Sequence, residues 1–157
     1  MSVRDRLEDA VVLWRQGRKS GAWIQVLIAA AATSRERFPS MKDGEAFRAF
    51  VREITPTIVD SKSAAIPGGV NVVFNADGGN LMSLDQVLYK HLRCNLLHEA
   101  VMPAEVHLSE SHIVDGKLVA DLRGGSPLTI PDFWVLHLAK AVAHAPENSS
   151  TCADLFP

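Results

Sequence analysis

SLDQVLYKHLRCNLLHEAV, residues 83–101, is the stretch that decides the fold of this chain. Ser83 followed by Gln86 has the spacing of a capping box, which starts a helix, and the stretch ends where Met102 meets Pro103. Apolar residues surround most of the helix that this pattern predicts over residues 84–101, so the helix lacks a broad solvated face. Such a helix needs packing partners on nearly every side.

The flanking sequence predicts further helices and one hairpin. Start signals and apolar repeats predict three helices before residue 55, beginning near Ser2, Ser20 and Ser40 and ending near Gln16, at Phe38-Pro39 and at Thr55-Pro56. Residues 55–82 contain many Pro and Gly residues and predict mostly loop, with a short strand over residues 70–74. Alternating apolar residues around Asp115-Gly116, at Val106 and Leu108 and again at Leu118 to Leu122, predict a β-hairpin. Pro131 opens a last helix that stops before Pro146.

The predicted fold class is mainly α, an antiparallel helical bundle of about five helices with a β-hairpin inserted before the last helix. The chain has 157 residues, 47% of them hydrophobic, which suits one globular domain over residues 1–147 followed by a polar C-terminal tail over residues 148–157. The longest uncharged stretch, residues 20–34, is shorter than the roughly 18 residues that a membrane span needs. No secretory signal is visible, so we expect a cytoplasmic protein without membrane contact.

The charge distribution restricts nucleic-acid binding to a local contact. The net charge is −2, and residues 1–52 carry ten Lys or Arg against six Asp or Glu, whereas residues 53–157 carry six against twelve. A domain that binds nucleic acid over its whole surface is strongly basic, and this chain is not. Its densest basic cluster, Arg15, Arg18 and Lys19, is a candidate for contacts with phosphate.

The helix predicted over residues 84–101 also carries polar groups that cost free energy to bury without partners. His91, Asn95 and His98 fall within about 60° of one another on a helical wheel, whereas Arg93 lies roughly 140° from His98. A symmetric dimer that pairs this helix with itself would cover its apolar surface and bring two Arg93 and His98 sets into one cleft.

These residue types suit RNA cleavage, because RNA supplies its own nucleophile, the 2′-hydroxyl. His98 would transfer protons near neutral pH, and Arg93 would bind phosphate and stabilise its developing charge. Asn95 would assist as a third catalytic group, Glu99 would fix a histidine tautomer, and His91 and Glu99 would help to hold the substrate. The chemistry requires no metal and no cofactor, and the sequence contains no zinc-binding CxxC or HExxH pattern.

Arg93-Cys94-Asn95-Leu96-Leu97-His98 resembles the R-x4–6-H motif of the HEPN family, the higher eukaryotes and prokaryotes nucleotide-binding domain. The resemblance implies a small helical bundle that dimerises and a metal-independent endoribonuclease of the toxin or defence type. It also implies a neutralising antitoxin such as a small nucleotidyltransferase as a partner.

Two other interpretations of the same residues remain open. In the first, Arg93 pairs with a carboxylate of a neighbouring helix and His98 caps its own helix, so that neither is catalytic. In the second, the chain is a non-enzymatic helical interaction module, or a nucleotide- or RNA-binding module, that homodimerises through the motif helix.

Overall fold

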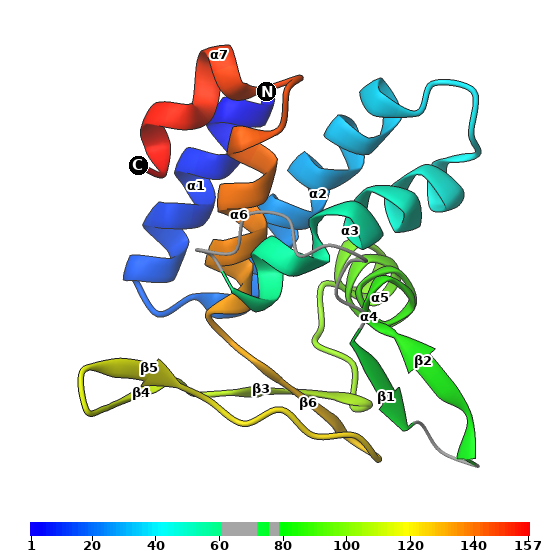
Figure 1. Cartoon of the computed structure of the whole chain (residues 1–157), viewed down its shortest axis with the longest axis vertical. Helices are drawn as coiled ribbons and strands as arrows, with labels where there is room; N and C mark the ends of the chain where they lie inside the picture. Colours follow the sequence, from blue (N-terminus) through cyan, green and yellow to red (C-terminus); the bar gives the residue numbers. More distant parts are fainter. Residues whose placement is uncertain (61–71, 76–78) are drawn as a thin grey trace.

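The computed structural model describes residues 1–60, 72–75 and 79–157 and is mainly α-helical. The helices are α1 (Val3–Arg15), α2 (Lys19–Arg37), α3 (Asp43–Val59), α4 (Leu84–Val87), the π-helix η2 (Leu88–Arg93), α5 (Cys94–Glu99), α6 (Trp134–His144), α7 (Ser149–Cys152) and the 3-10 turn η3 (Ala153–Leu155). The strands are β1 (Val73–Asn75), β2 (Leu81–Ser83), β3 (Val106–Ser109), β4 (His112–Val114), β5 (Lys117–Val119) and β6 (Leu128–Pro131). Figure 1 shows these short strands gathered along one end of the helical part.

The two helix starts predicted at Ser2 and at Ser83 are both capping boxes in the structure. The Ser2 N–H donates to Asp5 Oδ2 at 2.7 Å, and the Asp5 N–H donates in return to Ser2 Oγ at 3.2 Å. At the start of α4 the Ser83 N–H donates to Gln86 Oε1 at 2.9 Å. These three hydrogen bonds satisfy backbone donors that the start of a helix leaves free, which confirms both predicted starts.

The hydrophobic core forms around α2, which packs against α1, α3 and α6. Its Trp23 and Leu27 are fully buried, as are Phe47 and Phe50 of α3 and Leu138 of α6. Tight packing on several sides explains why α2 is apolar around most of its circumference.

The prediction that Thr55-Pro56 ends the third helix is wrong, because α3 continues to Val59 with Pro56 inside it. A proline within a helix removes one backbone hydrogen bond. Burial offsets this loss, since Ile58 in the last turn is fully buried in the core. The Asp60 N–H also donates to the Pro56 carbonyl at 2.9 Å and closes the helix end.

The predicted hairpin turn is confirmed, but one of its strands was assigned to the wrong partner. Strands β4 and β5 pair antiparallel around Asp115-Gly116. Strand β3, which contains Val106 and Leu108, instead pairs in parallel with β6. A parallel pair joins residues far apart in sequence, and the local alternation of apolar residues does not specify such a partner. The strand predicted over residues 70–74 is seen as β1, Val73–Asn75, and residues 61–71 lie outside the described part of the chain.

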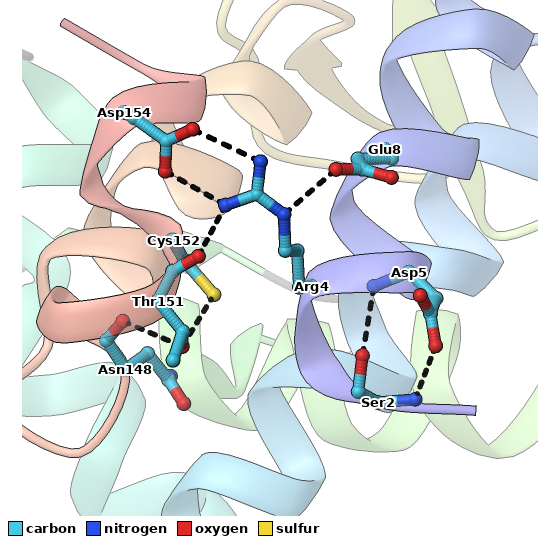
Figure 2. A network of polar contacts seen from close by, with 8 residues as sticks. All are labelled: Ser2, Arg4, Asp5, Glu8, Asn148, Thr151, Cys152 and Asp154. Carbon is cyan, nitrogen blue, oxygen red and sulfur yellow. Dashed lines mark hydrogen bonds and ion pairs between the residues drawn. The ribbon is translucent and has the colours of Figure 1, made fainter.

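Two predictions about the C-terminal region also change. Pro131 is the last residue of β6 and not the first of a helix, since α6 begins at Trp134. Residues 148–157, predicted as a polar tail, form α7 and η3, with Cys152 fully buried. Figure 2 shows how Arg4 of α1 holds this segment: its guanidinium pairs with Asp154 at 2.8 and 2.9 Å and also contacts the Thr151 carbonyl.

Candidate functional site

The motif helix consists of three consecutive segments, α4, η2 and α5, and ends at Glu99. In η2 the Cys94 N–H donates to the Tyr89 carbonyl, five residues earlier, instead of four as in an α-helix. At its end Ala100 adopts a left-handed conformation with φ 55° and donates its N–H to the Leu96 carbonyl at 3.1 Å. The helix is therefore two residues shorter than predicted, and its rotation per residue is not constant across residues 88–93.

Arg93 is held tightly by its own chain. Its side chain is only 15% exposed, and its Nη2 donates to Asp43 Oδ2 of α3 at 2.5 Å. The guanidinium also lies 5.2 Å from the centre of the Phe47 ring and 5.4 Å from that of Tyr89. The predicted carboxylate partner of Arg93 on a neighbouring helix is therefore present, as Asp43 of α3, whereas a non-catalytic role for Arg93 stays a prediction. Its Nε is buried and has no hydrogen-bond partner among the described residues.

The other predicted catalytic residues are less constrained than Arg93. His98 and Glu99 are exposed and Asn95 is half-buried. Within the described residues, none of these three side chains forms a hydrogen bond or an ion pair. His98 lies in the last turn of α5, where a cation interacts favourably with the helix dipole, but it does not hydrogen-bond the last carbonyls.

Arg93 and Leu97 line a hollow of about 1040 Å³ that we call the α2–α5 groove. Most of its wall comes from α2 and from the chain between α2 and α3. The residues that line it are Ile28, Ala31, Ala32, Arg35, Glu36, Phe38, Pro39, Met41, Asp43, Arg93 and Leu97. Asn95 and His98 are not part of this lining, so within one copy the groove brings Arg93 together with neither of them.

His91 lies at a different place, in a cavity of about 630 Å³ that we call the hairpin cavity. The cavity opens to solvent and is lined by α3, by the chain from β2 to the motif helix, by Glu105 and by the chain leading into β6. Its lining residues are Arg48, Asn80, Leu81, Met82, Gln86, Tyr89, Lys90, His91, Glu105, Gly125, Ser126 and Leu128. Burial, and secondarily the Lys90 ammonium, lower the pKa of His91 below its usual value, which favours the neutral imidazole.

The predicted phosphate-binding cluster is only partly available. Arg15 and Arg18 are exposed. Lys19 already has partners within the protein. Its ammonium contacts the buried carboxylate of Asp132 and lies 5.6 Å from the centre of the Trp14 ring. Lys19 therefore serves to hold α2 against the start of α6.

Sequence reasoning missed Arg48, Tyr89 and Lys90, which line the hairpin cavity together with His91. Lys90 is the direct neighbour of His91, and Tyr89 is the single tyrosine of the chain. The positions of Tyr89 and Lys90 next to His91 are the sequence signal that could have indicated them. Arg48 comes from another helix, and nothing in the local sequence links it to them.

The described residues contain no cluster of three or more His, Cys, Asp or Glu side chains that could hold a metal ion. Among the described helices, none combines the length and the apolar character needed to cross a membrane.

The comparisons with known proteins give one match. The family model described as Rv1289 matches residues 2–154, and this description names no activity. No curated protein and no solved structure matches the chain. Because the family model covers nearly the whole length, the chain belongs to the Rv1289 family.

Proposed function

We propose that the protein is a non-enzymatic helical interaction module that homodimerises through the α2–α5 groove. One observation carries this proposal: Arg93 is engaged by Asp43, while apolar side chains around it stay open to solvent. Leu97 is 36% exposed and Met41 is 47% exposed. A hollow apolar surface of this kind is typical of a protein interface.

The charges of the groove favour a second copy of the same chain as the occupant. Two cations, Arg35 and Arg93, line it together with two anions, Glu36 and Asp43. In a twofold dimer the same patch meets itself, so a patch with one sign of charge would repel its copy. A patch with both signs can pair with its copy, and the antiparallel helical bundle that we infer for the chain would hold it rigid.

Light scattering over a concentration series tests the dimer. We expect wild type to be dimeric at tens of micromolar and Leu97→Glu to be monomeric, because the variant places a charge in the apolar groove. Val12→Glu is the matched control: Val12 is 51% exposed on α1, outside the groove, and its variant should stay dimeric. A monomeric wild type, or a Leu97→Glu variant that dimerises equally well, would refute the proposal.

A HEPN-like metal-independent ribonuclease is a second candidate, favoured by the position of His98. His98 is exposed and directly follows Leu97 of the groove lining, so two copies that meet at the groove would bring His98 of one close to the groove of the other. A site for RNA would then be composite, with Arg93 exchanging part of its contact with Asp43 for a phosphate.

The reaction would proceed by attack of the RNA 2′-hydroxyl on the neighbouring phosphorus. The bond between the 2′-oxygen and phosphorus forms as the bond between phosphorus and the 5′-oxygen breaks. His98 of one copy accepts the 2′-hydroxyl proton, and His98 of the second copy protonates the leaving 5′-oxygen. Arg93 stabilises the charge that develops on the phosphate, with Asn95 assisting. We place either function in the cytosol, and the ribonuclease would have a neutralising antitoxin, such as a small nucleotidyltransferase.

Incubation of single-stranded RNA with the protein in EDTA separates the two candidates. A ribonuclease of this type should lose about 100-fold or more of its rate in His98→Ala and in Arg93→Ala. His112→Ala, which changes an exposed histidine of β4, is the matched control and should cleave at the wild-type rate. Intact RNA with wild-type dimer would exclude the ribonuclease and leave the interaction module.

A further inference from the structure

The hairpin cavity is a separate feature that neither candidate function uses. Its volume of about 630 Å³ lies in the range of sites that bind small molecules, which is roughly 300 to 1,000 Å³. Among the described residues, none lines both this cavity and the α2–α5 groove. A ligand bound there would therefore leave the groove accessible.

Two cations of the described chain, Arg48 and Lys90, line the cavity, and neither is paired with a carboxylate. Neither Arg48 nor Lys90 forms a salt bridge within the part of the chain that the structure describes. Glu105 is the one acidic residue among the lining residues that the structure describes. In a chain whose net charge is −2, this is a local excess of positive charge facing a cavity.

The guanidinium of Arg48 is held in place by contacts within the protein. Its Nε donates to the Gly44 carbonyl at 3.3 Å, and its guanidinium lies 6.0 Å from the centre of the Tyr89 ring. The terminal N–H groups of Arg48 have no hydrogen-bond partner among the described residues. A planar guanidinium held in this way suits two parallel hydrogen bonds to a carboxylate or a phosphate.

The rest of the lining suits the uncharged part of a ligand. Leu128 is buried, and Met82 is half-buried and packs against the core, so both offer apolar contacts. Asn80, Gln86 and Ser126 add amide and hydroxyl groups that can hydrogen-bond a ligand. The lowered pKa of His91 favours its neutral form, which can donate one hydrogen bond and accept another.

From these observations we propose that the hairpin cavity binds a small organic anion. Arg48 and Lys90 hold its charged head, a carboxylate or a phosphate monoester. Its apolar body lies against Met82 and Leu128. Inorganic phosphate lacks such a body, so it binds more weakly than an aromatic anion of the same charge.

Isothermal titration calorimetry with four probes tests this assignment: phenyl phosphate, benzoate, inorganic phosphate and neutral benzyl alcohol. We expect at least one of the two aromatic anions to bind with a Kd below about 1 mM, and benzyl alcohol and inorganic phosphate to bind at least about tenfold more weakly. The comparison between phenyl phosphate and benzoate shows which head group the cavity prefers. Failure of both aromatic anions to bind, or equal binding of benzyl alcohol, would overturn the proposal.

Variants then locate the binding site. Lys90→Gln and Arg48→Gln should each weaken binding of the preferred anion about tenfold. Because Arg48 also contacts Tyr89, its variant is checked for folding by circular dichroism, whereas Lys90 is exposed and its replacement should leave the fold intact. Lys117→Gln removes an exposed lysine of β5 outside the cavity and should bind as wild type does. Wild-type affinity in Lys90→Gln would overturn the assignment of the site.

Discussion

Gly44 and Tyr89 lie so close that a side chain at position 44 has no room: a Cβ atom there would sit 2.6 Å from the Tyr89 hydroxyl oxygen and 2.8 Å from Cζ. Tyr89 is not free to move away, because its ring is 6.0 Å from that of Phe47 and faces the guanidinium of Arg93 at 5.4 Å. This contact fixes the distance between α3 and the motif helix beside the hairpin cavity, which Tyr89 lines.

Gly44→Ala should destabilise the protein although alanine favours helices. We expect a loss of about 1 to 3 kcal/mol in the free energy of unfolding, because the whole tyrosine ring must shift. Urea denaturation followed by circular dichroism measures this. Gly21→Ala in α2 is the control: its Cβ would meet the flexible Leu13 Cδ1 at 3.3 Å, so that variant should be unchanged or up to about 1 kcal/mol more stable. Equal effects at both positions would contradict the proposed role of Tyr89.

Asp43→Ala should also destabilise the fold, since it removes the carboxylate that pairs with the mostly buried Arg93. We expect a cost of about 1 to 2 kcal/mol, because a buried guanidinium is left with one fewer partner. Asp121→Ala breaks an exposed pair with Arg123, whose side chains are 58% and 70% exposed, and should change stability by less than about 0.5 kcal/mol. Thermal unfolding of the two variants side by side checks this, and an Asp43→Ala variant as stable as Asp121→Ala would count against it.

The protein should become less stable as the pH decreases, because His91 has a lowered pKa in the folded state. Its pKa in the folded state lies below the usual value of 6.5, first because of burial and then because of Lys90, with Glu105 opposing the shift. The unfolded chain therefore binds a proton at His91 more readily than the folded chain does. The free energy of unfolding decreases as the pH drops below about 6.5. Urea denaturation at about pH 7.5 and about pH 5.5 should show a smaller loss in His91→Gln than in wild type. Equal losses would show that His91 does not contribute.

The C-terminal segment should contribute to stability mainly by its burial. Deletion of residues 149–157 removes the fully buried Cys152 and the apolar contacts of Leu155 and Phe156, and we expect a loss on the order of 3 kcal/mol. Asp154→Ala should have a much smaller effect, because its ion pair with Arg4 is exposed to solvent. Thermal unfolding distinguishes these cases, and a truncated protein as stable as the full chain would refute this role.

Local signals were sufficient to predict most helices. Ser2 with Asp5 and Ser83 with Gln86 start their helices through contacts within one turn, so the sequence carries the whole signal. The pairing of β3 with β6 depends on residues more than twenty positions apart, and the persistence of α3 beyond Pro56 depends on burial of Ile58. Neither is visible in a local pattern.

In the candidate site too, local features could be predicted from the sequence, whereas contacts between distant residues could not. A carboxylate partner for Arg93 could be predicted from the cost of burying a charge, although the identity of Asp43 could not. The hairpin cavity could not be predicted, because its walls come from four separate parts of the chain that meet only after folding. A helical wheel assumes one constant rotation per residue, which η2 does not keep, so the wheel does not determine how His91 is directed relative to Asn95 and His98.

The π-helical stretch Leu88–Arg93 has a consequence for how this chain can change in length. A π turn accommodates one residue more than an α turn between bonded backbone groups. Removing a single residue from this stretch would let α4 and α5 join as one regular α-helix, with Leu84 and Leu96 still directed inward. The centre of the motif helix is thus a place where the chain can tolerate a one-residue deletion, at the cost of the particular directions that Tyr89 and Arg93 now take.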